Sequence, residues 1–449
     1  MKTKTTALAA LLAALAAPLA AQPAPPLTLA EALRLAREHN PQYRKALNQV
    51  ESADADRRTR LGAFFPSLSV AVNSGGSYNR SYTGVDDFGN PTTLEDPRES
   101  RSSSMRQSVS LGSLTLFDGG VKLRDYRAAQ AAAAGARFGV AAEELRLRGE
   151  LERRYWKAVE AERLIALEER LLETAREQLD ATRRLVSVAV RTPVDVLAAE
   201  VKVAEQELAL ERARGERRRA ELDLRQEIGV IEGPPRPLAD EPAAPFDPAP
   251  LDADALLAAA FAANPRLDRA EAGVRAAEQR LGAARAGRFP TLSLTAGAGR
   301  ATNVSGYDAL VEPNPLDQSY SFGFQLNVPL FTQFATSGRI AQARATRNGA
   351  QEDARAERLA VERDVRSALI ELENAFRAAG NAERSLRLNR QRLELAQEQY
   401  RLGALSFTEL QDAVSGTATA EREALKARFT FAAALATLEE KVGAPVERP

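Results

Sequence analysis

The amino-acid sequence predicts a mainly α-helical fold with a small β part, built twice along one chain of 449 residues. Prolines are absent between Pro97 and Pro193 and again between Pro329 and Pro445, in stretches rich in Ala, Leu, Glu, Arg and Gln, which favour helices. Within these stretches apolar residues recur every seven positions, the period of helices that supercoil around one another. The stretches match at a constant offset of 214 residues, which predicts an internal duplication.

The seven-residue period predicts two very long helices, at about residues 119–190 and 335–402. An uninterrupted helix of about 70 residues is about 105 Å long, which is too long for a compact domain. We expect each one to form an antiparallel hairpin with a return helix, at residues 193–228 and 407–442. The apolar series are Leu151, Ala158, Ile165, Leu172, Leu179 and Val186 in the first long helix, and Val365, Leu372, Ala379, Leu386, Leu393 and Tyr400 in the second.

Helix-capping signals mark the turn of each hairpin. Thr192 is followed three positions later by Asp195, and Ser406 by Glu409, which is the pattern of a capping box. Gly403 lies just before the second motif and is expected to end the long helix. The sequence therefore predicts a helix start at each of these two places.

The shorter elements are duplicated as well, at an offset of 224 residues. Asn40-Pro41 and Asn264-Pro265 each interrupt a helix, because the residue before a proline avoids the helical region. The region between the two copies is rich in proline and is predicted to be a linker. The predicted organisation is a first repeat at residues 22–229, a linker at 230–251 and a second repeat at 252–449.

Four segments alternate apolar with small polar residues, the pattern of strands with one apolar face. They lie at about residues 66–74, 105–117, 290–299 and 319–331. In the second segment the apolar phase shifts between Leu111 and Leu114, which predicts a bulge near Gly112. The last segment is the most regular, with Tyr320, Phe322, Phe324, Leu326 and Val328 on one face.

An apolar face opposite a small polar face is typical of a strand in an outer-membrane barrel. A strand with one face on a soluble core has the same pattern. The long flanking helices favour the membrane interpretation. Because the smallest membrane barrels have about eight strands, four strands cannot close one alone. Two chains would give eight strands and a filled interior, and three chains would give twelve and an open lumen.

The first 21 residues are predicted to be a cleaved signal peptide. Lys2 and Lys4 precede an apolar run, and small residues at Ala20 and Ala21 offer a cleavage point, as in secretory signals. The apolar run is shorter than the roughly 20 residues of a membrane-spanning helix. The protein is therefore expected to be exported.

The composition argues against most kinds of chemistry. The chain has 61 basic and 61 acidic residues, no cysteine, and a single histidine, His39. The balanced charge gives no indication of a nucleic-acid partner, and the missing cysteines exclude thiolate metal sites and cysteine nucleophiles. We expect no catalytic site, no metal site and no cofactor.

The order and doubled spacing of these motifs resemble the TolC-type family of outer-membrane efflux ducts. The resemblance is carried by the two Asn-Pro breaks, the pairs Phe65-Pro66 and Phe289-Pro290, the strand exit Leu116-Phe-Asp-Gly-Gly120, and Tyr400-Arg-Leu-Gly403 followed by residues 406–412. It implies a trimer that shares one twelve-stranded β-barrel in the outer membrane, with four transmembrane strands per chain and a helical tunnel through the periplasm. It also implies contact with outer-membrane lipid, a periplasmic adaptor protein and an inner-membrane pump. The implied function is a passive exit duct for efflux or type I secretion.

The resemblance also points to candidate residues at the hairpin ends, which close the duct in this family. By position, Glu409 and Asp412 match acids that line the narrow end, while Asp195 and Tyr400 match residues that hold it shut. Gly403 belongs to the same segment. Leu405 stands where some members have an arginine, and Ala189 stands opposite Gly403, so the closing contacts are expected to differ. Glu409 is equally well explained as a helix cap.

Two other interpretations fit parts of the sequence. The main alternative is a periplasmic or surface coiled-coil structural or adaptor protein without a channel, although such a protein has no use for an aromatic strand face such as Tyr320-Ser-Phe322-Gly-Phe324. An enzyme is the weakest interpretation, because no nucleophile, base or ligand set converges in the sequence.

Overall fold

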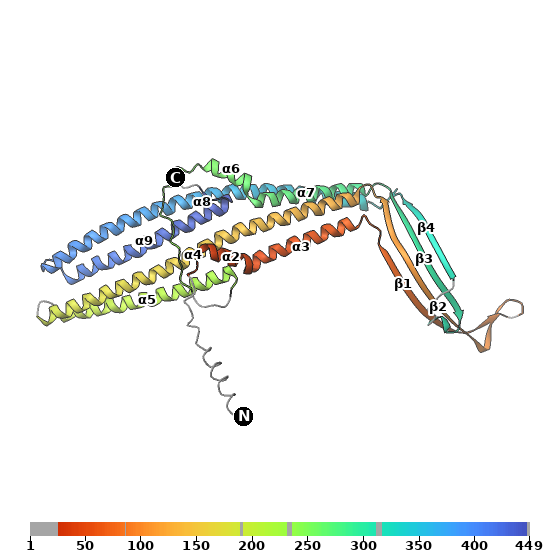
Figure 1. Cartoon of the computed structure of the whole chain (residues 1–449), viewed down its shortest axis with the longest axis horizontal. Coiled ribbons are helices and arrows are strands. Elements are labelled where there is room, and N and C mark those ends of the chain that lie inside the picture. The colour runs from red at the N-terminus through yellow and green to blue at the C-terminus, as the bar shows by residue number, and fades with distance from the viewer. Residues whose placement is uncertain (1–25, 86, 189–191, 231–235, 311–316, 447–449) are drawn as a thin grey trace, which may run out of the picture. The chain divides into compact units, whose positions relative to one another are not determined.

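The computed structural model describes residues 26–85, 87–188, 192–230, 236–310 and 317–446 (Figure 1). The predicted signal peptide lies outside these residues. The chain divides into two compact units, each described by itself below. One comprises Met1–Asn48, Gly139–Leu267 and Glu357–Pro449, and the other Gln49–Phe138 and Asp268–Ala356.

The described residues form helices in matched pairs, as an internal duplication requires. In each pair the two helices have the same length: 67 residues for the long helices α4 and α8, and 36 for the return helices α5 and α9. The first-repeat helices are α2 (Leu29–His39), α3 (Pro41–Gly62), α4 (Val121–Ser187) and α5 (Pro193–Ile228), and their counterparts are α6 (Ala253–Ala263), α7 (Pro265–Ala286), α8 (Ala335–Arg401) and α9 (Phe407–Val442). The prediction of a mainly helical fold with antiparallel strands is confirmed.

The strands form one antiparallel sheet in the order β1-β2-β3-β4 (Figure 1). The apolar residues of β4 are largely open to solvent in the single chain, with Tyr320 81% and Phe322 83% exposed. The predicted bulge is confirmed, because the β2–β3 register shifts between Leu111 and Leu114. The strands are β1 (Leu68–Val85), β2 (Pro91–Phe117), β3 (Thr291–Ser305) and β4 (Asp317–Asn327), and a short 3₁₀ helix (Asp308–Leu310) follows β3.

The first three strands are longer than the alternation of apolar residues predicts. β1 continues to Val85 and β2 begins at Pro91, beyond the predicted segments 66–74 and 105–117. The added residues are mostly polar on both faces, so no apolar period marks them, and backbone pairing holds them together. β4 is shorter than predicted and ends at Asn327, two residues before Pro329, which has no N–H group for the ladder.

Each Asn-Pro pair interrupts a helix, as predicted, and its asparagine also joins the ends of three helices. Asn40 is the C-cap of α2, and its side-chain oxygen accepts hydrogen bonds from the N–H groups of Gln42 (2.9 Å) and Tyr43 (3.1 Å) in α3. Its Nδ2 donates to the carbonyl oxygen of Glu227, at the end of α5, at 2.7 Å. Asn264 repeats the pattern, donating to the carbonyl oxygen of Lys441 at 3.3 Å. The short polar side chain forms hydrogen bonds with helix-end groups that would otherwise be unpaired. This role explains why both repeats have an asparagine at the helix break.

The turn from sheet to long helix uses the left-handed backbone conformation in both repeats. In the first, Gly119 and Gly120 have φ of 69° and 89°; at the equivalent places in the second, Gln333 and Phe334 have φ of 48° and 64°. A residue with a Cβ atom pays roughly 1–2 kcal/mol for this conformation. The second turn therefore stores strain that the first avoids.

We predict that Gln333→Gly stabilises the protein by about 1 kcal/mol, because glycine adopts φ above zero without a steric penalty. Thermal unfolding followed by circular dichroism would measure the change. Gly119→Ala is the matched control and should destabilise, since an added Cβ would lie 2.7 Å from Cβ of Phe289. An unchanged or lower stability in Gln333→Gly would contradict the strain assigned to this turn.

Tyr155 ties the start of the described chain to the linker at the core of the first unit. It is fully buried, and its hydroxyl lies 2.8 Å from the Leu27 carbonyl oxygen and 2.9 Å from the Asp240 carboxylate. The same carboxylate accepts a hydrogen bond from the N–H of Leu29 at 2.6 Å. Burial raises the pKa of Tyr155 to about 12, and the carboxylate of Asp240 adds to the shift.

This raised pKa predicts a specific loss of stability in alkali. The folded state keeps the phenol protonated above pH 10, where the unfolded chain loses its proton, so stability should fall as pH rises from 10 to 12. Tyr155→Phe should lower stability at pH 7 by about 1–3 kcal/mol, because the hydrogen-bonding partners lose the hydroxyl. The variant should also show a shallower decline than wild type between pH 10 and 12 in urea unfolding. Parallel declines would contradict the assignment.

Candidate functional site: the ends of the helical hairpins

The two helical hairpins end in capping boxes that hold both predicted acids. In the first, the Asp195 carboxylate accepts hydrogen bonds from the N–H and the hydroxyl of Thr192, both at 3.0 Å. In the second, the Glu409 carboxylate accepts from the N–H of Ser406 at 3.0 Å and its hydroxyl at 2.7 Å. Both acids therefore have a structural role at the first turn of a return helix.

The pKa of Glu409 is lowered, first by the hydrogen bond from the Ser406 side chain and then by the one from its backbone. Because the pKa is lowered, the ionised Glu409 side chain stabilises the folded state at pH values above the ordinary glutamate pKa. This stabilisation is lost as the pH falls through the folded-state pKa. The carboxylate is therefore charged at neutral pH, as a cap at a helix start requires.

Gly403 ends α8 in the left-handed conformation, with φ of 77°. The N–H of Gly403 donates to the carbonyl oxygen of Tyr400 at 3.1 Å, and the N–H of Ala404 to that of Gln399 at 2.9 Å. This arrangement satisfies the last carbonyl groups of the helix. The role of Gly403 in the structure is to turn the chain.

Tyr400 lies between two apolar clusters near the hairpin ends. Its ring is tilted against that of Phe407, with the ring centroids 6.2 Å apart. One cluster joins both hairpins through Leu179, Ala199 and Phe407, and the other joins α8 to α9 through Ala396, Leu410 and Ala413. Tyr400 thus packs where the two hairpins meet. The sequence did not single out Phe407, although a large apolar residue directly after a cap is a recognisable signal.

The remaining candidates are distributed around this end of the molecule. Asp412 is exposed on α9, while Leu405 is half-buried and packs in the second cluster. Ala189 lies outside the described residues. The structure therefore brings Tyr400 and Leu405 into one packed region and leaves the carboxylates of Glu409 and Asp412 open to solvent.

A partly buried polar cluster, here called the α4–α9 clamp, consists of Glu168, Gln206 and Arg422. The guanidinium of Arg422 donates two hydrogen bonds to the Glu168 carboxylate, at 2.6 and 2.7 Å, and its Nη2 also lies 3.2 Å from Oε1 of Gln206. Gln206 donates to Glu168 as well. The Glu168 side chain is only 3% exposed. The clamp therefore joins α4, α5 and α9 through a charge pair whose carboxylate is removed from water, while the Arg422 side chain is 33% exposed.

The sequence contains one indication of this clamp, an acidic residue at a core-facing position of the long helix. Glu168 lies three residues after Ile165 and four before Leu172, so it occupies the core-facing stripe of a supercoiled helix. A charge at such a position needs a buried partner. Nothing local in the sequence, however, identifies Arg422, which is 254 residues away.

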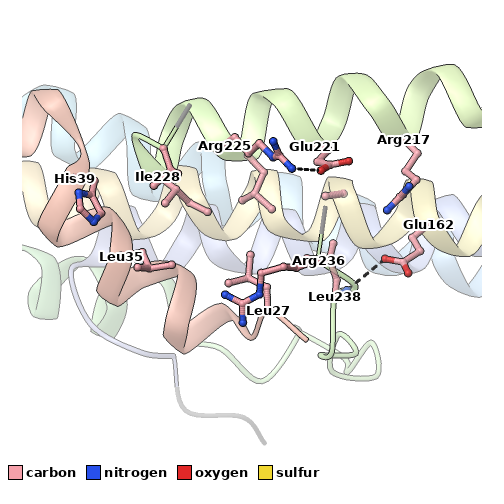
Figure 2. Close-up of a pocket in the computed structure, with 13 residues that line it drawn as sticks. Leu27, Leu35, His39, Glu162, Arg217, Glu221, Arg225, Ile228, Arg236 and Leu238 are labelled. Carbon is pink, nitrogen blue, oxygen red and sulfur yellow. Dashed lines mark hydrogen bonds and ion pairs between the residues drawn. The ribbon is translucent and has the colours of Figure 1, made fainter. Parts of the chain in front are cut away.

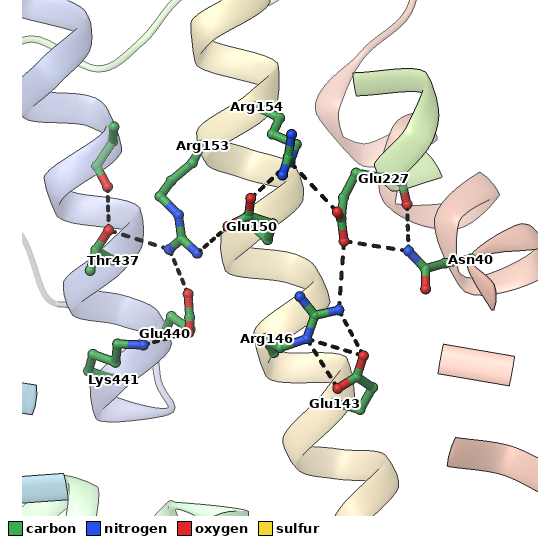
Figure 3. A network of polar contacts seen from close by, with 11 residues as sticks. Asn40, Glu143, Arg146, Glu150, Arg153, Arg154, Glu227, Thr437, Glu440 and Lys441 are labelled. Atoms are coloured by element: carbon green, nitrogen blue, oxygen red, sulfur yellow. Dashed lines mark hydrogen bonds and ion pairs between the residues drawn. The ribbon is translucent and has the colours of Figure 1, made fainter. Parts of the chain in front are cut away.

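A second polar network ties α4 to both return helices farther from the hairpin ends (Figure 3). Arg153 lies 2.6 Å from Glu440 of α9, while Arg154 lies 3.6 Å from Glu227 of α5. Burial raises the pKa of Glu227, and Arg146 and Arg154 oppose that shift. The network fixes the ends of α5 and α9 on either side of α4.

A cavity of about 350 Å³ lies between α2, α4, α5 and the linker (Figure 2). Its floor is apolar, with Leu35, Leu224 and Ile228 among the lining residues. Two arginines at its rim are neutralised by neighbours: Arg225 lies 2.7 Å from Glu221, and Arg236 lies 3.0 Å from Glu31. His39 stands at the exposed end of α2, in the position that favours a cation.

Among the described residues, no helix is both long and apolar enough to cross a membrane. The same residues contain no group of three or more histidine, cysteine or acidic side chains suited to holding a metal ion.

Comparison with known proteins supplies relatives for both sequence and fold. The family model described as outer membrane efflux protein matches residues 32–230 and 256–444. Protein CyaE of Bordetella pertussis is 31% identical over 351 residues, which cover 74% of this chain and 67% of that protein. The outer membrane efflux protein BepC of Brucella suis is 28% identical over 190 residues, covering 42% of this chain and 40% of BepC.

Solved structures share the fold at low sequence identity. A membrane protein from Pseudomonas aeruginosa matches with a TM-score of 0.76 and 21% identity, covering 92% of this chain and 93% of that one. The CmeC outer membrane channel of Campylobacter jejuni matches with a TM-score of 0.75 and 17% identity, covering 93% and 86%. The family match spans most of both repeats, and the predicted resemblance is confirmed. The chain belongs to the outer membrane efflux protein family.

Proposed function

We propose that this protein is the outer-membrane exit duct of a tripartite efflux or type I secretion system. In this proposal it is a homotrimer that conducts substrate passively from a periplasmic adaptor and an inner-membrane pump to the outside. It performs no catalysis and needs no cofactor. Its membrane part is one twelve-stranded barrel in contact with lipid, and its helices form a tunnel in the periplasm.

The observation that carries the proposal is the four-stranded sheet. Its register places Phe322, Ala296, Leu111 and Leu68 in one row across the strands, and the outermost members of that row are 83% and 71% exposed. The neighbouring positions on each strand are small and polar, as in Ser321. An exposed apolar face of this kind is stable when lipid covers it.

The edges of the same sheet support several chains per barrel. In the described residues β1 pairs only with β2, and β4 only with β3. Unpaired strand edges cannot face lipid, because nothing there satisfies their backbone groups. Pairing the β1 edge of one copy with the β4 edge of the next removes both edges, and three copies give the twelve strands of an open lumen.

The first test is the mass of the detergent-solubilised mature protein, corrected for bound detergent. Three chains per particle would support the duct, and the protein should fractionate with outer membrane and require detergent for release. A monodisperse single chain would overturn the proposal, since four strands cannot seal themselves in lipid. Release by salt alone would favour the alternative of a coiled-coil scaffold.

We propose in addition that Asp195, Tyr400, Gly403, Glu409 and Asp412 belong to the gate at the periplasmic end. Symmetry would bring three copies of each exposed acid near one axis, and rings of acids favour cations. Their exposure supports this role for Glu409 and Asp412. Tyr400 and Gly403 would act by setting the packing and the turn of the second hairpin.

Neutralising the acids at the hairpin ends would separate a role in the gate from a role as a helix cap. Asp412→Asn should lower the cation preference measured as a reversal potential in planar bilayers, with stability changed by less than about 0.5 kcal/mol. Glu409→Gln should lower both the cation preference and, through the weakened cap, the stability. An unchanged reversal potential in both variants would remove these acids from the gate.

A further inference from the structure

The cavity between α2, α4, α5 and the linker is lined by two opposite charges that belong to no ion pair. Arg217 of α5 and Glu162 of α4 both line it, and both are half-buried (Figure 2). Within the described residues neither side chain has an oppositely charged partner. The Glu162 carboxylate accepts only a long hydrogen bond, of 3.4 Å, from the N–H of Leu238. The other two arginines of the lining are neutralised by neighbouring glutamates.

The register of α4 against α5 brings these two charges close together along the helices. Arg214 of α5 contacts Glu169 of α4 at 3.4 Å. Because the two helices are antiparallel, seven residues farther toward the cavity Glu162 is level with Glu221, which is one helical turn from Arg217. The two charges therefore lie at the same end of the cavity, on different helices, without meeting in an ion pair.

The rest of the lining is mostly apolar. Leu35, Leu224 and Ile228 contribute to it, and the last two are buried in the core cluster that joins α2, α4 and α5. The volume of about 350 Å³ falls within the range of small-molecule sites, about 300–1,000 Å³. Water in the apolar part would find few hydrogen-bonding partners. An apolar group fits this part of the cavity better than water does.

We propose that the cavity binds a zwitterionic amphiphile, a molecule with an apolar tail and a head that carries both an anionic group and an ammonium group. The tail lies on the apolar lining. The guanidinium of Arg217 donates hydrogen bonds to the anionic group, and the carboxylate of Glu162 accepts them from the ammonium group. A half-buried charge without a partner is unfavourable, and this ligand supplies a partner to both charges at once.

An amphiphile with a single charge satisfies the cavity less well. An anion that binds Arg217 is repelled by the nearby carboxylate of Glu162, and a cation that binds Glu162 is repelled by the guanidinium. His39, the remaining titratable residue of the lining, lies at the opposite end (Figure 2). The proposal concerns a site within one subunit, so it stands or falls independently of the proposed duct.

Three probes with the same eight-carbon chain test the head group. 2-Aminooctanoate carries both charges, octanoate lacks the ammonium group, and octylamine lacks the carboxylate. Each would be titrated by calorimetry at pH 7 into the full-length mature protein in a non-ionic detergent, with the detergent alone as blank. 2-Aminooctanoate is expected to bind at least tenfold more tightly than either of the other two. Native mass spectrometry of the same mixtures should count one probe molecule per chain.

A fourth probe identifies the source of the head group. Lysophosphatidylethanolamine with an eight-carbon acyl chain carries the same two charges on a phosphate and an ammonium group. Binding tighter than that of 2-aminooctanoate would assign the site to a phospholipid, and weaker binding would assign it to an amino-acid head. Both results support a zwitterion site.

Substitutions at the two charges test the placement of the head. Arg217→Gln and Glu162→Gln should each weaken the binding of 2-aminooctanoate at least tenfold, and Arg217→Lys should lose less affinity than Arg217→Gln because it keeps the charge. The matched control is Arg218→Gln. Arg218 is the next residue on α5, is exposed and does not line the cavity, so this variant should bind as wild type does. Circular dichroism would verify that each variant keeps its helices.

Three results would overturn the proposal. Equal affinity of wild type for octanoate and 2-aminooctanoate would show that the ammonium group has no binding partner. Unchanged affinity in Glu162→Gln would remove that carboxylate from the site. Failure of all four probes to bind the wild-type protein would leave the cavity without this ligand class.

Discussion

Replacing Arg422 with methionine is expected to lower the free energy of unfolding by about 3–5 kcal/mol. The substitution removes the two hydrogen bonds of 2.6 and 2.7 Å to Glu168 and leaves that carboxylate buried without its charge partner. Glu168 also anchors Gln206, so the loss extends to the contact with α5. Urea unfolding followed by circular dichroism at 222 nm would measure the change.

The matched control is Arg390→Met, which breaks the pair with Glu421 between α8 and α9. The Arg390 side chain is 60% exposed, and exposed pairs contribute about 0–1 kcal/mol. A combined Glu168→Leu and Arg422→Met variant should recover most of the stability lost in Arg422→Met alone, because apolar replacements of a buried pair are often neutral or stabilising. A loss below about 1 kcal/mol in Arg422→Met would show that the clamp is hydrated and does not hold the hairpins together.

Repetition and apolar period made the helices predictable, because both depend on local sequence. The seven-residue series through Leu151 and Leu372 predicted the long helices, and both series members are fully buried in the structure. The capping boxes at Thr192 and Ser406 were also visible, since a cap needs only residues three positions apart. These features require no knowledge of distant contacts.

Long-range polar contacts were not predictable in the same way. Asn40 could be recognised as a helix break, but its bond to the carbonyl of Glu227 joins residues 187 positions apart. Arg422 and Glu168 are separated even farther along the chain. The extension of β1 and β2 was missed because those residues pair through backbone groups, which leave no apolar period to detect. Sequence patterns therefore predicted elements well and the contacts between elements poorly.

The membrane role of the sheet predicts opposite outcomes for neighbouring residues of β4. Phe322→Arg places a charge on the apolar face and should destabilise the assembled protein by about 2–4 kcal/mol, the cost of arginine near the bilayer midplane. Ser321→Arg places the same charge one residue away on the small polar face, where a lumen would hydrate it. It should assemble normally and change single-channel conductance or ion preference.

Folding into lipid vesicles, titrated with urea, would measure both variants beside wild type. Because Ser321 and Phe322 share one strand and pair with consecutive residues, Gly297 and Ala296 of β3, any difference between the variants reflects the face and not the position along the strand. Equal destabilisation by both arginines would mean that neither face meets water, as in a sheet packed inside a soluble protein. A larger cost at Ser321 would reverse the assignment of lumen and lipid. A cost confined to Phe322 would place lipid against the aromatic face, and the sheet could then be covered only by closing with the sheets of other copies.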